Sequence, residues 1–555
     1  MCGIILIITR NYKSEINLLE LFQIFREVIS RRGPNSLGIE LFTTKDNIQL
    51  LFAATVLWLQ GEQITKQPVI NKTSILIYNG DIFQGIPEEC KYQIGDTKYI
   101  FDLLNGVEPS EVHEKLYELQ GPYALIFYDK LKNDIYFGRD KFGRRSMLIG
   151  KGRNSIILTS VAKRNSDFNF MELPSVGTFI WNLISNDIVL YLFSNNNYSH
   201  KKIIELEEFI EQKIHIVSTP TISSLQFRYP NAEQFSILES IIGKSGEEVF
   251  QILLSNNEWL SKVTHLHSLL KDSVARRILG QPKFCSMCIK DKIHCSHSSL
   301  GVLFSGGVDC SILTLLCNEF VNKDKPIDLF NVAFDAINGF KTPDRLTGLE
   351  TLQELKQLCP NRKWRFKEIN ISKKELDEKR DECIADLIHP LKTVLDDSLG
   401  CALWFASRGD DDSHCRVLFV GMGADELFGG YTKHRAAFKR ESWLGLHNTL
   451  VEDWDNLPYR NLARDDRVVS DHGKQLRTPY LDENLVNFVH NLQCWERSYP
   501  SEKVPQGLGD KILLRSLAYH LGLRKAAFLK KRALQFGSRI ANNKEVAHEI
   551  SSRLG

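Results

Sequence analysis

The stretch Leu300–Cys317, which reads LGVLFSGGVDCSILTLLC, decides the fold of the C-terminal half of this chain. Leu300–Phe304 is a short apolar run of the kind that forms a buried strand, and Cys310–Val321 has the composition of an apolar helix. Two further apolar runs, Asp328–Phe334 and Arg416–Val420, are predicted to be buried strands. Because strands and helices alternate here, the sequence predicts a parallel α/β sheet.

The turn between that strand and that helix has the composition of a phosphate-binding loop. Gly306 and Gly307 let the backbone approach a phosphate closely, and the N-terminus of the following helix supplies N–H groups and positive potential. Asp309 is placed to hold a magnesium ion on the same phosphates. The loop lacks the Gly-Lys-Ser/Thr ending of a Walker loop, so we do not expect hydrolysis of a γ-phosphate.

The N-terminal part, to about residue 185, is predicted to consist of sheets with a few covering helices. Apolar residues at intervals of four, three and four predict one helix, which Gly33-Pro34 ends. Its apolar positions are Leu18, Phe22, Phe25 and Ile29. Turn residues separate short β-prone runs. These runs are Leu50–Leu59, Ser74–Tyr78, Tyr123–Tyr128, Asp134–Phe137, Ser155–Thr159 and Thr178–Asn182.

The composition is that of an ordinary globular chain, and its 555 residues are enough for two or three domains. The 70 basic and 68 acidic residues leave a net charge of +2, so nothing favours nucleic acid or an acidic membrane as a partner. No apolar run is long enough to span a bilayer, and no signal peptide is expected. Twelve cysteines are too few for a disulfide scaffold, so we expect reduced thiols and a cytoplasmic location.

Cys2 is a candidate nucleophile because removal of Met1 would place its thiol beside a free α-amino group. Such an amine has a pKa of about 7.7–8.0 and can act as a local base. Asn79-Gly80 follows a predicted strand and offers a side-chain amide and a backbone N–H that suit an oxyanion hole. Asp96 can meet a substrate ammonium group. A cysteine at position 2 is weak evidence alone, so these neighbours carry the argument.

Together with other short motifs, these residues resemble a class-II glutamine amidotransferase domain over roughly residues 2–180. The other motifs are Arg31–Asn35, Gln67-Pro68 and Gly138–Gly143. The resemblance implies an N-terminal-nucleophile hydrolase with an αββα sandwich fold. It also implies that Cys2 attacks the side-chain amide of glutamine, that Asn79 and Gly80 hold the oxyanion, and that Asp96 binds the α-amino group.

The phosphate-binding turn resembles the PP-loop of ATP pyrophosphatases, which release pyrophosphate and leave AMP on the substrate. The motifs that follow it are similar to the synthetase domain of asparagine synthetase, over roughly residues 298–540. They are Val420–Tyr431, Asp466-Arg467, Gly473, Arg477–Asp482 and Lys531–Ser538. Two longer runs, Thr393–Gly409 and Asp465–Lys474, resemble those of a divergent branch, the asparagine synthetase domain-containing proteins.

This second resemblance implies ATP as a substrate and magnesium as its metal. The implied ATP and pyrophosphate ligands are Phe304, Ser305, Gly306, Gly307, Asp309, Gly421 and Lys531, with Arg532 as an alternative to Lys531. Asp309 and Asp425 would hold the magnesium ion. The side-chain carboxylate of aspartate would attack the α-phosphorus, and ammonia from the first site would then displace AMP and form asparagine.

Two positions depart from the family pattern. Val56 stands where the family has an arginine for the α-carboxylate of glutamine, which removes a charge-assisted pair. Met422 stands where the family has a glutamate, and methionine cannot accept a proton. Loss of a general base costs about 10²–10⁴-fold in rate. For Val56, the alternatives are that glutamine binds weakly or that another arginine serves. For Met422, they are that Glu426 or another carboxylate substitutes, that the synthetase reaction is slow, or that the acceptor is a carboxylate other than aspartate. Both departures also leave open a catalytically weak nucleotide-binding scaffold.

Cys285-x-x-Cys288, followed by Cys295 and His297, has a spacing compatible with a small structural zinc site. A tolerated insertion of free thiols explains the same residues, and a disulfide is the weaker alternative among reduced thiols.

The sequence therefore predicts two domains of mixed α+β and α/β class. We expect a glutamine amidotransferase domain at residues 2–185, a linker or insertion of uncertain structure at 186–297, a synthetase domain at 298–540 and a tail at 541–555. The synthetase domain is expected to be a parallel-sheet PP-loop domain of the adenine-nucleotide alpha-hydrolase type. The expected small-molecule partners are glutamine, aspartate and ATP, and a homodimer is compatible with the resemblance.

Overall fold

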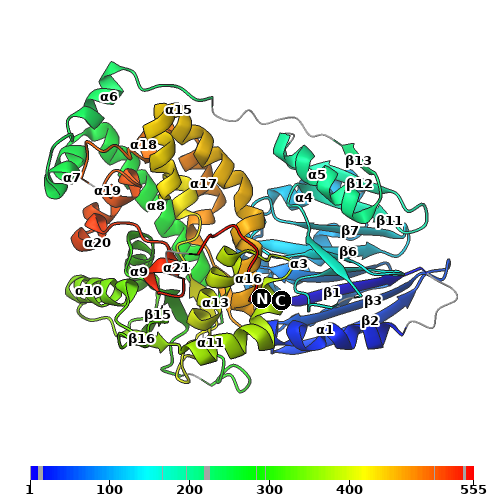
Figure 1. The fold of residues 1–555 in the computed structure, drawn as a ribbon. Coiled ribbons are helices and arrows are strands. Elements are labelled where there is room, and N and C mark those ends of the chain that lie inside the picture. Colours follow the sequence, from blue (N-terminus) through cyan, green and yellow to red (C-terminus); the bar gives the residue numbers. More distant parts are fainter. Residues whose placement is uncertain are drawn as a thin grey trace.

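The computed structural model describes residues 2–10, 17–165, 167–194, 197–217, 226–282, 284–293, 295–505, 507–541 and 545–554. Its two lobes lie side by side: a β-rich lobe from the N-terminal part, in blue and cyan, and a helix-rich lobe from the remainder, in green to red (Figure 1). None of the helices in the described ranges is long and apolar enough to cross a membrane.

The N-terminal lobe is built on two facing sheets. The first has six antiparallel strands in the order β10 (Asn169–Glu172), β8 (Leu148–Lys151), β9 (Ser155–Thr159), β1 (Gly3–Thr9), β3 (Gln49–Val56) and β2 (Ser36–Thr43). The second has seven strands in the order β13 (Ile214–Val217), β12 (Ile188–Leu192), β11 (Gly177–Asn182), β7 (Asp134–Arg139), β6 (Tyr123–Asp129), β5 (Ser74–Gly80) and β4 (Val69–Ile70).

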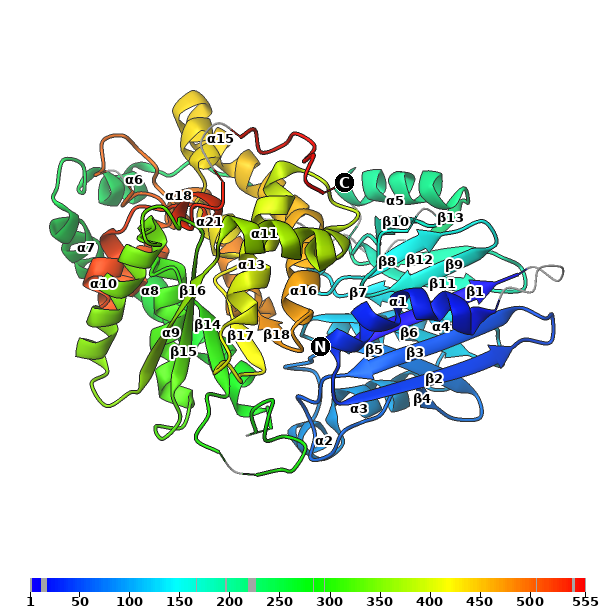
Figure 2. The same ribbon diagram turned by 60° about the horizontal axis from the view of Figure 1, so that its bottom comes forward.

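Strand β1 is apolar along its whole length because both of its faces are covered. Ile5 and Ile7 pack beneath helix α1 (Leu18–Arg32), whereas Ile4 and Leu6 face the second sheet. Figure 2 shows α1 lying across the first sheet. Helices α3 (Gly95–Leu104) and α4 (Pro109–Glu118) cover the outer face of the second sheet. The order of layers is therefore helix, sheet, sheet, helix, which confirms the expected αββα sandwich.

The second sheet continues beyond residue 185. In β12 the buried side chains of Ile188, Leu190 and Leu192 alternate with more exposed ones, as on a strand with one face in the core. Strand β12 pairs antiparallel with β11 and parallel with β13, and helix α5 (Asn197–Ile210) connects β12 to β13. The first part of the 186–297 segment thus belongs to the sandwich.

The C-terminal lobe contains a five-stranded parallel sheet, as expected. Its order is β16 (Trp364–Asn370), β15 (Ile327–Ala333), β14 (Leu300–Leu303), β17 (Val417–Phe419) and β18 (Gln475–Arg477). From β14 the chain runs outward through β15 and β16, and later returns to add β17 and β18 on the other side. The strand order therefore reverses between β14 and β17, and such a switch point opens a crevice at the carboxyl ends of the strands.

Helices cover both faces of this sheet. Helices α8 (Asn257–Leu279), α9 (Val308–Phe320) and α19 (Ile512–His520) share one apolar core with one face. Helices α13 (Val394–Arg408) and α16 (Ala463–Ser470) pack on the other. The remaining α-helices are α2 (Glu88–Gln93), α6 (Ala232–Glu239), α7 (Gly246–Ser255), α10 (Pro343–Leu358), α11 (Lys373–Lys379), α12 (Ala385–Ile388), α14 (Ala424–Phe428), α15 (Thr432–Leu457), α17 (Glu483–His490), α18 (Cys494–Arg497), α20 (Arg524–Phe528) and α21 (Leu534–Gly537).

Two segments outside the predicted synthetase domain pack against the C-terminal lobe, namely the second half of residues 186–297 and the C-terminal tail. Helices α7 and α8 pack into its main core through Val249, Phe250 and Leu266, among others. The C-terminal tail lies along the start of α13, where the Val394 amide donates to the Glu549 carbonyl at 2.9 Å. The second half of the 186–297 segment and the described part of the tail are therefore packed parts of the C-terminal lobe.

Buried charges join the two lobes. Four consecutive residues of α16, Arg464 to Arg467, are almost fully buried. Asp466 pairs with Arg32 at 2.8 Å and with Arg145 at 3.2 Å, both in the N-terminal lobe. Arg467 pairs with Glu172 of the same lobe at 2.6 Å. A buried charge is costly unless it is paired, so these contacts specify how the lobes dock.

We expect Asp466→Asn to destabilise the protein. The substitution preserves shape but leaves Arg32 and Arg145 buried without their counter-charge, a change that costs about 3–5 kcal/mol. Thermal unfolding followed by circular dichroism should therefore shift down by several degrees.

Asp412→Asn is the matched control, since Asp412 also bridges two cations, Arg365 and Lys367, but its side chain is 60% exposed. An exposed pair contributes about 1 kcal/mol or less. If the unfolding temperature fell equally in Asp466→Asn and Asp412→Asn, the buried pairs between the lobes would contribute no more to stability than an exposed pair.

Candidate active sites

The loop after β14 is held in one conformation by its neighbours. Gly306 has a φ of +82°, and a Cβ there would lie 2.6 Å from the Thr347 carbonyl oxygen. Its own carbonyl accepts hydrogen bonds from the hydroxyls of Thr351 at 2.9 Å and Ser311 at 3.2 Å. Gly307 is the N-cap of α9 and no side chain caps that helix. The loop therefore presents backbone N–H groups at a helix N-terminus, as phosphate binding requires.

Two carboxylates from either side of the switch point meet at this loop. Asp309 lies at the start of α9, and Asp425 lies in α14, just after β17. The Lys511 ammonium is 2.7 Å from an Asp309 oxygen and 2.6 Å from an Asp425 oxygen. Lys531 pairs with the other oxygen of Asp425. A Cβ at Gly430 would collide with Asp425 and Lys511, so only glycine leaves room for this cluster.

The electrostatics of the cluster follow from its burial. Burial raises the pKa of Asp425, but the charges of Lys511 and Lys531 outweigh it and hold that pKa well below its usual value. Burial opposes the charge of Lys531, yet Asp425 and Asp309 together raise its pKa. The Asp425 carboxylate is thus kept ionised. The carboxylates of Asp309 and Asp425, with the Lys511 ammonium between them, form an oxygen donor set of the kind that fits magnesium.

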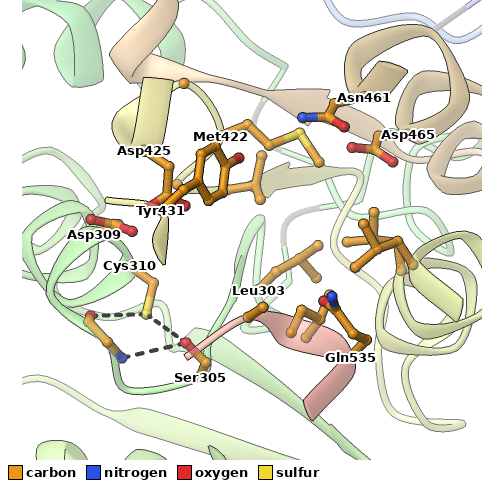
Figure 3. Close-up of a pocket in the computed structure, with 18 of the residues that line it drawn as sticks. Leu303, Ser305, Asp309, Cys310, Met422, Asp425, Tyr431, Asn461, Asp465 and Gln535 are labelled. Carbon is orange, nitrogen blue, oxygen red and sulfur yellow. Dashed lines mark hydrogen bonds between the residues drawn. The ribbon is translucent and has the colours of Figure 1, made fainter. Parts of the chain in front are cut away.

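The cluster lies at one end of a cavity of about 720 Å³. Figure 3 shows Asp309 and Asp425 at that end, with Asn461 and Asp465 at the other. Apolar side chains from α13 form part of the wall. The predicted residues that line the cavity are Phe304, Ser305, Gly307, Asp309, Gly421, Asp425 and Lys531. The predicted residue Gly306 belongs to the loop but does not line the cavity. Arg532 does not line it either, and its side chain donates to the Thr347 hydroxyl at 3.2 Å.

Met422 and Glu426 both line this cavity. Met422 packs against Leu457 and Leu481, so its position is apolar. Glu426 accepts hydrogen bonds from the Tyr431 hydroxyl at 2.7 Å and from Asn461 at 3.2 Å. Burial and the nearby charge of Asp425 raise the pKa of Glu426 to about 7. Glu426 is therefore suited to exchange a proton near neutral pH.

The predicted glutaminase residues come together between the two sheets of the sandwich. The Cys2 amide donates to Asn79 Oδ1 at 2.9 Å, and Gln67 Nε2 lies 3.6 Å from the Cys2 sulfur. The Cys2 side chain is buried, which raises its pKa. Asn79 Nδ2 is buried and has no hydrogen-bond partner among the described residues. Such an orphaned donor beside a nucleophile is suited to stabilise an oxyanion.

Asp96 lies in the same buried region, with a carboxylate that accepts from the Tyr78 hydroxyl and the Ile82 amide, each at 3.2 Å. Burial and the charge of Asp81 raise the pKa of Asp96 to about 6. Asp81 itself pairs with Arg477 of the other lobe at 2.6 Å. A substrate ammonium group at Asp96 would therefore relieve an uncompensated negative charge.

Val56 ends β3 and its side chain is buried among apolar residues. Arg32 donates to the Cys2 carbonyl at 3.4 Å, but it also pairs with Asp466. Among the residues that the structure describes, the arginine at Cys2 is therefore Arg32, whose charge is already paired with Asp466.

Sequence reasoning did not identify Lys511. A single lysine before an apolar helix has no motif of its own, and its role depends on two distant carboxylates. Its φ of +55° is unusual for a lysine, but only the structure shows it. Asp344, which lines the cavity and has a pKa raised by burial to about 7, was also not identified.

The cysteine and histidine group predicted for zinc converges as well. Ligand atoms of Cys285, Cys288, Cys295 and His297 all lie within 4.8 Å of one another. This group lies in the loop that leads into β14, away from the cavity described above.

Comparisons with known proteins agree with both halves of the structure. The family model described as a glutamine amidotransferase domain matches residues 1–165, and the model described as asparagine synthase matches residues 292–448. A solved glutamine phosphoribosylpyrophosphate amidotransferase from B. subtilis aligns over 60% of this chain and 66% of its own. That alignment has 13% identity and a TM-score of 0.27, too low to support an argument.

Curated relatives match over most or all of the chain. The chain is 38% identical to a Drosophila melanogaster asparagine synthetase domain-containing protein, with 100% of both chains covered. It is 33% identical to asparagine synthetase domain-containing protein 1 of Homo sapiens, with 100% of this chain and 97% of that protein covered. It is 25% identical to a putative glutamine-hydrolysing asparagine synthetase of Methanocaldococcus jannaschii, with 76% and 66% covered. The chain therefore belongs to the asparagine synthetase domain-containing proteins.

Proposed function

We propose that this protein is a glutamine-dependent amidotransferase that adenylates aspartate with ATP and converts it to asparagine. The observation that carries the proposal is the meeting of Asp309 and Asp425 at the loop after β14, with Lys511 between them. Two carboxylates and a backbone N–H cradle at the mouth of a large cavity are what an ATP α,β-phosphate site needs.

The first half-reaction releases ammonia from glutamine. Once Met1 is removed, the α-amine of Cys2 takes the thiol proton, and the sulfur attacks the side-chain amide carbon of glutamine. Asn79 Nδ2 and the Gly80 N–H stabilise the oxyanion. The protonated α-amine then gives its proton to the amide nitrogen, the C–N bond breaks, and ammonia leaves a thioester on Cys2. Asp96 holds the α-ammonium group of glutamine. Water then hydrolyses the thioester to glutamate.

The second half-reaction activates the acceptor. The loop N–H groups and Lys531 bind the phosphates, and Asp309 and Asp425 are the residues that would hold magnesium. Magnesium, when bound, would neutralise charge on the phosphate oxygens. A side-chain carboxylate oxygen of aspartate forms a bond to the α-phosphorus, and the bond from that phosphorus to pyrophosphate breaks. Lys511 and Lys531 stabilise the charge that develops on the leaving pyrophosphate.

Ammonia then attacks the acyl carbon, and AMP leaves with the electrons of the C–O bond. The attacking nitrogen must lose a proton during this step. We assign this proton to Glu426, because it lines the cavity, is hydrogen-bonded in place, and has a pKa near 7. Glu426 would thus do the work of the glutamate that the family has at the position of Met422.

A second candidate is the same chemistry on another carboxylate. The apolar wall formed by Leu395, Leu399 and Leu403 of α13 supports this alternative, since it offers no charge to a polar amino acid.

One assay separates the candidates: the purified protein receives ATP, magnesium and aspartate with either glutamine or ammonium, and pyrophosphate and asparagine are measured. Asparagine from both nitrogen sources supports the proposal. If the protein binds nucleotide but releases no pyrophosphate with aspartate or with any other carboxylate, it is a nucleotide-binding scaffold and not an active ligase.

Replacing the nucleophile separates the two half-reactions. We expect Cys2→Ala to abolish glutamine-dependent product and to leave ammonium-dependent product within about twofold of the unmodified protein. The reason is that ammonium bypasses the thiol. Cys90→Ser, at a partly buried cysteine of α2, is the control and should retain both activities. An equal loss of both activities in Cys2→Ala would argue against separate sites.

Replacing Glu426 tests the proton transfer. We expect Glu426→Gln to lower product formation from ammonium by about 10²–10⁴-fold, as loss of a general base does, while aspartate-dependent exchange of pyrophosphate into ATP persists. A base acts in its deprotonated form, so the unmodified rate at a fixed concentration of free ammonia should rise as pH increases through about 7. The variant should lack that rise.

Asp344→Asn is the matched comparison for this test. Asp344 also lines the cavity with a pKa raised to about 7, but it belongs to α10. If Asp344→Asn removed the rise with pH and Glu426→Gln did not, the proton would be assigned to the wrong carboxylate.

A further inference from the structure

The loop between α8 and β14 carries a second set of side chains that converge on one point. The Cys285 sulfur lies 3.4 Å from His297 Nδ1, and the Cys288 sulfur lies 3.7 Å from the same atom. The Cys295 sulfur completes the group, with all four ligand atoms within 4.8 Å of one another. Zinc bonds of about 2.3 Å to sulfur and about 2.0–2.1 Å to nitrogen give tetrahedral edges of about 3.6–3.8 Å. The observed sulfur–nitrogen distances are close to those edges.

The disulfide alternative does not fit this arrangement. Cys285, Cys288 and Cys295 are all unbridged in the structure. A disulfide would join two of these sulfurs and leave the third beside an unused imidazole, whereas four ligands around one point satisfy every member of the group.

A buried arginine distinguishes a metal site from a group of neutral thiols. Arg416 is only 3% exposed, and its one described side-chain hydrogen bond goes from Nη2 to the Trp58 carbonyl. Its Nε and Nη1 are buried and have no hydrogen-bond partner among the described residues. Burial, and then the charge of Arg477, lower the pKa of Arg416 to about 9, and its interaction with Cys285 acts in the opposite direction. Neutral thiols would leave this guanidinium without a counter-charge, which is costly in a protein interior.

A zinc ion with three thiolates and one neutral histidine carries a net charge of −1. Such a group beside Arg416 supplies the counter-charge that the buried guanidinium otherwise lacks. The imidazole of His297 also lies edge-on to that of His414, with ring centroids 5.2 Å apart. The Ser286 amide donates to the His414 carbonyl at 2.9 Å, which connects the loop to the segment that leads into β17.

The loop needs such a link because it has little regular structure of its own. No helix or strand is present in its described residues between Leu279 and Leu300. Even so, Cys285 is fully buried and Ile289 almost so. A stretch of this length inside a compact domain is held by something other than backbone pairing.

The position of the loop connects it to both lobes. Lys292 lies over the ring of Trp58, with its ammonium 5.4 Å from the ring centroid. Trp58 follows β3 of the sandwich, and its carbonyl accepts from Arg416, which precedes β17. Strand β17 leads to Met422 and Asp425 in the cavity. The same few residues therefore touch the glutaminase lobe, the loop and the strand that carries the active site.

We propose that Cys285, Cys288, Cys295 and His297 bind one structural zinc ion, which fastens the α8–β14 loop to the start of β17 and to Trp58 of the glutaminase lobe. The ion has no open coordination position when all four residues bind, so its role is to hold structure and not to take part in the reaction.

The metal content of the purified full chain tests the proposal. We expect about one zinc per chain by inductively coupled plasma mass spectrometry when the protein is prepared with reducing agent and zinc, and loss of that zinc in Cys288→Ser. Cys90→Ser, at a partly buried cysteine outside the group, should keep it. Cobalt in place of zinc should give the visible bands of a tetrahedral thiolate site in the unmodified chain and in Cys90→Ser, but not in Cys288→Ser.

Two further measurements use the unmodified chain, in case Cys288→Ser does not fold. Native mass spectrometry should show the mass of one zinc, which is lost on mild acidification. Removal of zinc with 1,10-phenanthroline should speed tryptic cleavage at Lys290 and Lys292 several-fold. A chain that carries no zinc after this preparation, or a Cys288→Ser variant that keeps as much as Cys90→Ser, would overturn the metal site. Cleavage at the same rate with and without zinc would overturn the fastening role.

Discussion

The arrangement of the C-terminal lobe depends on a charge cluster in which Lys511 lies between Asp309 and Asp425. The two carboxylates come from connections on opposite sides of the point where the strand order reverses, so they meet only because β14 and β17 are neighbours. Buried carboxylates repel each other unless a cation lies between them. Lys511 therefore allows the two carboxylates to lie close together at the end of the cavity.

Helix α16 connects this crevice to the other lobe. Arg464 and Asp465 line the cavity, while the next two residues, Asp466 and Arg467, pair with arginines and a glutamate of the glutaminase lobe. One turn of helix thus faces both the cavity and the interface between the lobes. A shift of one lobe relative to the other would separate these buried ion pairs, which is costly. The pairs therefore favour a fixed arrangement of the two lobes.

The two departures from the family pattern have different physical settings. Met422 packs against Leu457 and Leu481, where a glutamate would be buried beside apolar side chains. Glu426 lies nearby with hydrogen bonds from Tyr431 and Asn461, so a carboxylate is still available to the cavity. At Val56, the described arginine next to Cys2 is Arg32, which is already paired with Asp466. The departure at Met422 therefore leaves a carboxylate at the cavity, whereas the departure at Val56 leaves an arginine whose charge is already paired.

The sequence by itself determined the elements whose signals are local. The helix at Leu18–Arg32, the strand and helix around Ser305–Asp309, and the β-prone runs of the sandwich follow from apolar spacing and turn residues a few positions apart. Strands β2, β12 and β18 were not predicted: β18 has only three residues, too few for a periodic signal, whereas β2 and β12 do alternate in exposure and could have been recognised. Only the tertiary structure decided that Lys511 joins Asp309 to Asp425, that β12 and β13 complete a sheet, and that Arg416 donates to the Trp58 carbonyl. Each of these depends on contacts between residues far apart in the chain, which no local pattern can encode.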